Sequence, residues 1–293
     1  MKPFIEKLMD PFLVILFSFI WTSAFIAGAF SIPYLGPYFT LLVRFALSAV
    51  LLFLMALISK SYLFDLTTVK TGLIMGLFNN VIYLSCSFAA LQYISPSWVT
   101  IIVSCSPFIT AIFAPILRLE KFSVKKICAV FIGFFGVYII IGRNLTNANY
   151  IGIMLAAIGA VSFVAGTLYF KYKGTEQSGL ALNFWQSIIG TVMLIPLSVL
   201  LYPKNGIAFS ILSGFAVLYL VVVVTIAGML LWFYLIKKNG AATASIYHLI
   251  NPFFGVLLAH IFFGAKITPM DCIGLVIIAG AIILGRKPAA LRA

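Results

Sequence analysis

The sequence predicts an all-α membrane protein with ten transmembrane helices, built as two inverted five-helix repeats. Composition, the spacing of apolar segments and an internal repeat are the three observations that predict it. The 293 residues are 63% hydrophobic and 9% charged, and their mean hydropathy is +1.19. Soluble domains are roughly 45–50% apolar and about 25% charged. So few charged side chains cannot cover a soluble surface, and the apolar excess is therefore expected to face lipid.

Ten apolar segments are each long enough to cross a bilayer, which takes about 20 residues of helix. They are residues 11–30, 37–58, 69–91, 96–117, 124–142, 151–170, 180–201, 208–235, 241–263 and 269–285. The short connections carry residues typical of helix ends, including Pro33, Asn239, Gly240 and Pro269. No small-residue cleavage pattern follows the first segment, so we expect it to be a retained span and not a signal peptide. The gaps leave no room for a soluble domain.

The placement of basic residues predicts how the chain is oriented. If the N-terminus is inside, 15 of the 19 lysines and arginines lie in inside segments and three lie in outside segments. Arg44 falls within a span. This bias predicts that both termini are cytoplasmic. The net charge of +13 therefore reflects topology signals in short loops, and it does not indicate a nucleic-acid partner.

The second half of the chain repeats the first. An offset of 145 residues aligns residues 90–142 with the region that starts at Leu235, and an offset of 142 aligns earlier parts of the two halves. The pairs include Pro107 with Pro252, Lys121 with Lys266, Trp21 with Phe163, and Arg44 with Gln186. Five spans in each half give the second half the opposite orientation. Residues 1–142 and 151–293 are thus expected to form an inverted-topology repeat, which is typical of secondary transporters with a substrate site near the midplane.

These features resemble the drug/metabolite transporter superfamily, and within it the ten-span EamA-type group. The resemblance covers nearly the whole chain. Its elements are Trp21, Arg44-Phe45, the run 90–95, Pro107, Leu119-Glu120, the glycines 133 and 136, Gly240-Ala241-Ala242 and Pro252. One departure is that Glu120 pairs with Ala265, whereas the family usually repeats the acidic residue. The resemblance implies a transporter that moves small metabolites, often amino acids, across a bacterial inner membrane, mostly outward.

Polar side chains within the spans are candidates for the substrate site, because a polar group in hydrocarbon is costly unless it is paired or faces water. The predicted substrate-binding residues are Trp21, Asn79, Asn80, Tyr83, Ser104, Tyr247, His248 and Asn251. Trp21 has packing as its alternative role. Arg44 is a buried charge, whose alternative role is a structural link to carbonyl groups or to Gln186. For His248, a substrate contact, proton coupling and a plain interhelical hydrogen bond all remain open.

Two prolines fall inside predicted helices. Pro107 and Pro252 would kink the fourth and ninth spans and free the carbonyl groups of Val103 and His248. They are predicted hinges, with packing as the alternative. No carboxylate lies deep in a span, and no phosphate-binding loop or metal-ligand cluster is evident, so no cofactor, no metal and no enzymatic activity are expected.

The sequence therefore predicts a secondary transporter, an exporter or exchanger, that moves amino acids or similar small polar metabolites by alternating access. The buried Arg44 and the missing carboxylate favour zwitterionic, neutral or anionic substrates. The alternative is a multidrug or lipid-type efflux protein, which would need a wider apolar cavity. The lipid bilayer is the expected partner and protons are candidate coupling ions. Monomer and dimer both remain open.

Overall fold

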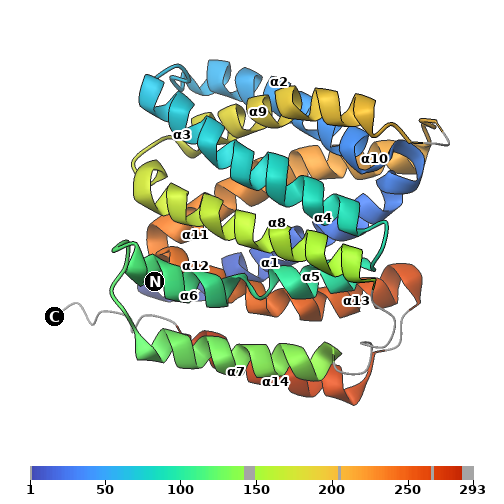
Figure 1. Ribbon diagram of the computed structural model, residues 1–293. Helices are drawn as coiled ribbons and strands as arrows, with labels where there is room; N and C mark the ends of the chain where they lie inside the picture. The colour runs from blue at the N-terminus through green and yellow to red at the C-terminus, as the bar shows by residue number, and fades with distance from the viewer. Residues whose placement is uncertain (1, 142–148, 204–205, 265–266, 286–293) are drawn as a thin grey trace.

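The computed structural model describes residues 2–141, 149–203, 206–264 and 267–285, and these residues form helices and short connections with no strand (Figure 1). Eight helical segments are long and apolar enough to span a membrane, and they cover eight of the ten predicted spans. The two others are α7, with 18 residues, and α14, with 17. The predicted fold class is confirmed: the described residues are all-helical and form ten apolar segments, five in each of two repeats.

The first repeat contains five spans. The first two are α1 (Lys2–Leu35) and α2 (Pro37–Ser59). The third consists of α3 (Leu66–Gly76), η1 (Leu77–Tyr83) and α4 (Leu84–Ala90). The fourth consists of α5 (Pro96–Val103) and α6 (Ser106–Ile116), and the fifth is α7 (Val124–Ile141). Pro33 was expected in a connection, but α1 continues through it. Gly36 ends the helix instead, because its φ of 71° turns the chain into α2.

The second repeat is divided in the same way. The sixth span is α8 (Tyr150–Tyr169) with η3 (Phe170–Gly174), and the seventh is α9 (Gly179–Leu200). The eighth consists of α10 (Ile211–Tyr219), η4 (Leu220–Gly228) and α11 (Met229–Asn239). The ninth consists of α12 (Ala241–Ile246), η5 (Tyr247–Ile250) and α13 (Asn251–Phe263), and the tenth is α14 (Pro269–Gly285). The two repeats interlock, since α2 packs along α9, and α7 along α14. The third span packs on α8 as the eighth packs on α1.

Both predicted proline positions break a helix. The fourth span is interrupted at Ser104 and Cys105, and the ninth passes through the 3-10 turn η5. Pro107 and Pro252 then lie in the first turn of α6 and α13, where a missing N–H costs least. The carbonyl of His248, predicted to be freed, accepts a hydrogen bond from Ser104 Oγ at 2.9 Å. The breaks of the two repeats are therefore joined to each other.

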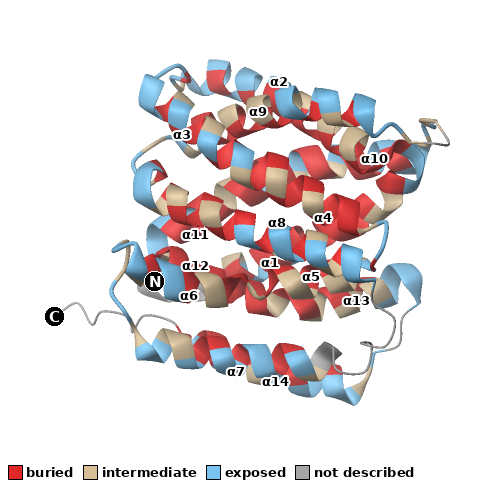
Figure 2. Cartoon of the chain, viewed as in Figure 1, coloured by how far each residue is buried: buried red, intermediate tan, exposed pale blue. Residues whose placement is uncertain are grey.

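The sequence did not predict the π-helical segments η1 and η4. They occupy equivalent positions in the two repeats, in the third and eighth spans. Wide turns of this kind occur frequently at functional sites. Buried side chains concentrate along the middle of the bundle, and the exposed helix faces carry large apolar residues such as Ile58, Val199 and Phe215 (Figure 2). The outer surface thus suits lipid, whereas the interior holds polar groups.

Candidate functional site

A small cavity lies between the repeats at the level of the two π-helical segments. It is lined by four of the predicted substrate-binding residues, Trp21, Asn79, Asn80 and Tyr83, and by Arg44, the predicted buried charge. Phe163 and Thr225 complete its wall from the second repeat. Its volume of about 20 Å³ has room for a water molecule or two and not for a metabolite. In this structure the cavity is therefore too small to hold a metabolite.

Arg44 is the charged group of this cavity, and its side chain is buried, with 3% exposed. Its Nε donates a hydrogen bond to Thr225 Oγ1 at 2.7 Å, and its guanidinium carbon lies 5.5 Å from the centroid of the Phe45 ring. Its Nη1 has no hydrogen-bond partner, and no carboxylate forms an ion pair with it, among the residues that the structure describes. Arg44 is thus a buried cation held by a hydroxyl and by aromatic faces.

The π-helical turn of η4 allows Thr225 to hold Arg44. The hydroxyl of Thr225 donates to the carbonyl of Leu220, five residues earlier, at 2.9 Å. Its oxygen therefore remains free to accept from Arg44. The carbonyl of Thr225 accepts in turn from Asn183 Nδ2 at 2.6 Å. The irregular backbone and the buried charge are parts of one arrangement.

Three amide side chains form a second polar group beside Arg44. Asn79 Nδ2 donates to Gln186 Oε1, and Asn80 Nδ2 donates to the backbone carbonyl of Gln186, both at 2.9 Å. Gln186 was expected as an alternative partner of Arg44, but it binds Asn79 instead. Asn79 Oδ1 and Gln186 Nε2 are buried without partners within the described part of the chain. Gly166 packs so closely on Asn79 that a side chain at Gly166 would collide with the amide.

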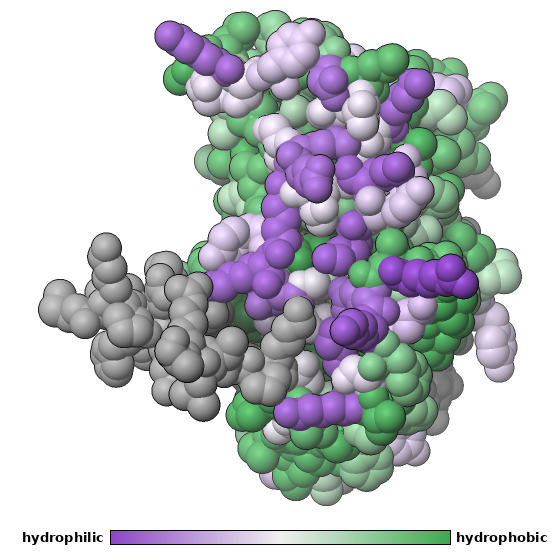
Figure 3. Space-filling view, turned by 90° about the vertical axis from the view of Figure 1, so that its left-hand side faces the viewer, coloured by the Kyte–Doolittle hydropathy of each residue, from purple (hydrophilic) through white to green (hydrophobic). Residues whose placement is uncertain are grey.

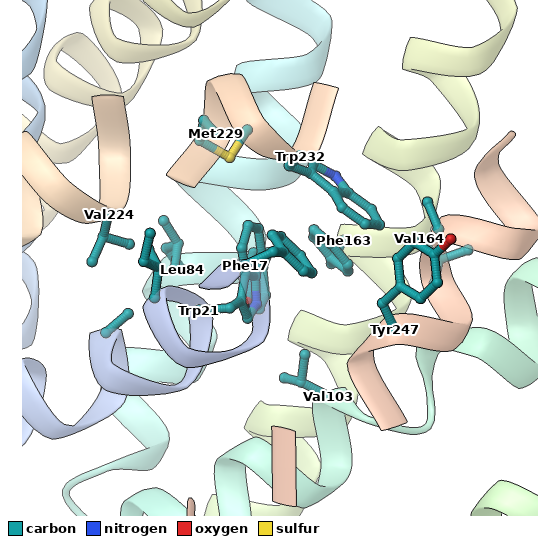
Figure 4. Packing of buried hydrophobic residues seen from close by; sticks show 14 of the residues in the cluster. Phe17, Trp21, Leu84, Val103, Phe163, Val164, Val224, Met229, Trp232 and Tyr247 are labelled. Atoms are coloured by element: carbon teal, nitrogen blue, oxygen red, sulfur yellow. The ribbon is translucent and has the colours of Figure 1, made fainter. Parts of the chain in front are cut away.

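Aromatic rings form another wall of the site, and Trp21 and Phe163 among them line the cavity (Figure 4). Trp21 and Phe163, which the repeat pairs with each other, meet with ring centroids 5.1 Å apart. Trp21 Nε1 donates to the hydroxyl of Tyr83 at 3.2 Å. Trp232 stacks on Phe163 at 5.6 Å. The wall therefore combines apolar ring faces with one indole N–H and one phenol hydroxyl.

His248 lies behind this wall and does not line the cavity. It is fully buried, and four rings surround it: Phe17, Trp21, Phe163 and Trp232, with centroids 4.9 to 5.2 Å from the imidazole. Asn251 Nδ2 is 2.9 Å from His248 Nδ1, so the amide and the imidazole share a hydrogen bond. His248 Nε2 has no hydrogen-bond partner in the portion described by the structure.

The remaining predicted residues lie near His248 and connect helices. Ser104 Oγ binds the carbonyl of His248, and the carbonyl of Tyr247 accepts from Ser18 Oγ at 3.1 Å. The carbonyl of Asn251 accepts from Thr22 Oγ1 at 3.3 Å. Four of the eight predicted substrate-binding residues thus gather at the cavity, and Ser104, Tyr247, His248 and Asn251 gather behind it. A substrate contact for these four remains a prediction.

Sequence reasoning did not include Phe163 and Thr225 among the site residues, although both line the cavity. The signal that finds them is the internal repeat. The offset of 142 pairs Phe163 with Trp21, and the offset of 145 pairs Thr225 with Asn80. Since a site between inverted repeats draws on equivalent positions of both halves, each predicted residue points to its counterpart.

Known proteins share this architecture over nearly its whole length. An uncharacterized transporter of Archaeoglobus fulgidus is 24% identical over 266 residues, which covers 90% of this chain and 92% of the relative. The uncharacterized transporter YvbV of Bacillus subtilis is 26% identical over 278 residues, covering 94% and 90%. A solved crystal structure superposes with a TM-score of 0.77 at 15% identity, covering 93% of this chain and 94% of its own. That likeness shows a common fold.

A family-wide comparison gives the same division into halves. Residues 9–142 and residues 150–285 each match the EamA-like transporter family. The two matches cover both repeats, including every residue that lines the central cavity. The chain therefore belongs to the EamA-like transporter family, in the drug/metabolite transporter superfamily, and is a multi-pass membrane transporter.

Proposed function

We propose that the protein is a secondary transporter for small metabolites that carry a carboxylate, amino acids first among them. The observation that carries this proposal is Arg44, a buried guanidinium in the cavity wall without an acidic partner in the described chain. A buried charge is costly unless it is paired. A substrate carboxylate at the cavity would accept from the unpartnered Nη1 and would supply the missing counter-charge.

The rest of the cavity suits the remainder of such a substrate. Asn79 and Asn80 bring two amide side chains to the cavity wall, and an amide can pair with an amino group or a carboxyl group. Trp21 and Phe163 offer ring faces to an apolar side chain. None of the residues that line this cavity is acidic, so it offers nothing to neutralise a cationic drug. The multidrug alternative therefore has less support than a zwitterionic, neutral or anionic metabolite.

Alternating access is the mechanism that these features support. The cavity is too small for a substrate, so it must open for binding. The basic end of the bundle is the end that carries the inside segments with their lysines and arginines. There, Glu120 Oε1 accepts from the backbone N–H of Ala242 at 3.2 Å, and Glu120 Oε2 pairs with Lys126 at 2.8 Å. This contact ties the loop after α6 to the start of α12 in the other repeat. Its release would let the two repeats separate at that end.

We place the protein in a bacterial inner membrane with both termini in the cytoplasm, working as an exporter or exchanger. The bias of basic residues supports this orientation, and a relative in Escherichia coli is named an uncharacterized inner membrane transporter. That relative, YedA, is 24% identical over 271 residues. A reporter fused after Ala293 should be active only in its cytoplasmic form. Periplasmic activity would contradict the orientation.

Competition in proteoliposomes tests the substrate class. Exchange of a labelled neutral amino acid would be measured against the unlabelled amino acid, its decarboxylated amine and a quaternary dye. The amino acid should compete best, because only it offers a carboxylate to Arg44. If the amine and the dye compete better, the proposal is wrong and the multidrug alternative takes its place. Lys125→Gln, which removes an exposed charge far from the cavity, is the control for general charge effects.

A further inference from the structure

Two apolar crevices on the outside of the bundle are related by the internal repeat. One lies between α8, α6 and η1 and holds about 620 Å³; the other lies between α1, α13 and the eighth span and holds about 670 Å³. Most residues of the first crevice pair with residues of the second at the repeat offsets. Examples are Phe78 with Val223, Leu117 with Phe262, and Tyr172 with Phe30. The inversion places the first crevice toward the basic end and the second toward the opposite end.

The two crevices differ in the charges beside them. In the crevice near the basic end, Arg118 lies between the lining residues Leu117 and Leu119, and Lys171 and Lys173 flank the lining residue Tyr172. Lys173 Nζ is 4.5 Å from the centroid of the Tyr172 ring. In the opposite crevice, the described residues adjacent in sequence to the lining carry no charge. The hydrophilic residues gathered at the basic end are seen in Figure 3, with hydrophobic surface around them.

A general bias of basic residues toward the cytoplasm does not by itself account for this pattern. Lys171 and Lys173 belong to η3, the last helical turn of the sixth span, and not to a loop. The acidic residue nearest the lining, Glu120, is already occupied by Lys126 and by Ala242. Glu176 is exposed just beyond η3, and its single negative charge is outnumbered by the three positive charges of Arg118, Lys171 and Lys173.

We infer that the crevice near the basic end binds an anionic phospholipid of the inner leaflet. One acyl chain would lie along Phe78, Phe113 and Leu168 between η1, α6 and α8. The phosphate would be held by Lys171, Lys173 and Arg118, as basic pockets between helices on the cytoplasmic side bind anionic headgroups. The equivalent crevice at the opposite end has the apolar groove without the cations, and it takes acyl chains of any lipid. This inference does not depend on the transported substrate.

Lipid binding to the purified, delipidated protein tests the inference. Phosphatidylglycerol should bind more tightly and raise the melting temperature more than phosphatidylcholine. In Lys171→Gln/Lys173→Gln this preference should fall roughly 30-fold, because each cation near a headgroup of net negative charge contributes about fivefold in affinity. Lys60→Gln/Lys70→Gln removes the same charge from the same end, outside the crevice, and should keep the preference. Equal binding of the two lipids, or an equal loss in both double variants, would overturn the inference.

Two further arms separate the headgroup from the acyl chain. Val161→Trp fills the crevice from an exposed position of α8, so the fold should tolerate it, and it should weaken both lipids. Val276→Trp, at an exposed valine of α14 outside both crevices, should change neither. Soluble glycerol phosphate should not stabilise the protein as the lipid does. Full stabilisation by glycerol phosphate, or unchanged lipid binding by Val161→Trp, would show that the crevice holds no acyl chain.

Discussion

The central site has two sides that bury an ionisable group in opposite ways. Around Arg44, polar side chains and aromatic rings leave a small cavity, and several hydrogen-bonding atoms there lack partners in the described structure. Around His248 four aromatic rings fill the space, and Asn251 occupies one ring nitrogen. A charged side chain with unpaired donors beside a cavity is suited to bind a ligand. A side chain that aromatic rings enclose is suited to hold the cavity wall in place. We therefore propose that the first side recognises the substrate and that the second side positions the first.

Removal of the charge at Arg44 should have the largest effect. Arg44→Gln should lower exchange of a carboxylate substrate about 100-fold, since truncation at a buried charged pair costs 2–5 kcal/mol. The melting temperature of the empty protein should stay the same or rise, because the variant removes a buried charge that lacks an acidic partner. Arg44→Lys should retain part of the activity. A strongly lowered melting temperature with unchanged exchange would make Arg44 a structural residue.

Crowding of the amide cluster should have the next largest effect. In Gly166→Ala the new methyl group would meet the Asn79 amide and separate it from Gln186, which should lower exchange roughly tenfold. Gly214→Ala adds the same methyl group to open space on α10 and is the matched control. Exchange kinetics and melting temperature would be measured for both. Equal behaviour of the two variants would show that the amide contact does not matter.

The helix breaks next to His248 test the positioning role of the His248 side, and a smaller effect is expected there. Pro107→Ala and Pro252→Ala should slow exchange by several-fold and leave equilibrium binding of the substrate near normal, because gating and not contact is altered. The measurement is the turnover rate set against a binding titration. Weaker binding with normal turnover would move these prolines to the recognition side. Unchanged turnover in both variants would leave them as packing residues.

His248 should show the smallest effect. Glutamine can still accept the hydrogen bond from Asn251, so His248→Gln should keep exchange and pH-driven accumulation within about threefold of the wild type. His248→Ala, which loses that bond, should be less stable. If accumulation vanishes in His248→Gln while exchange survives, His248 is the proton-coupling group. The His248 side would then provide the proton coupling that drives transport.

The sequence was sufficient to predict the fold class and to single out five of the thirteen residues that line the cavity. Apolar segment lengths and the basic residues predict the spans, and the repeat brings Trp21 and Phe163 together across the molecule. The irregular backbone could not be read from the sequence, because η1 and η4 contain residues that also fit an α-helix. For the same reason the sequence could not separate His248 from the cavity. Helical spacing places polar side chains on a face, but the rings that intervene come from other spans.

The π-helical segment η1 makes the site sensitive to chain length as well as to residue identity. Asn79, Asn80 and Tyr83 all belong to these seven residues. Deletion of one residue there would restore α-helical winding, because a π-helical turn holds one residue more than an α-helical turn. The wide turn that presents the amides and the phenol to the cavity together would then be lost, although no side chain of the site had been replaced. A relative that lacks one residue within 77–83 is therefore expected to transport a different substrate. Such a deletion should indicate the change of substrate more reliably than most substitutions do.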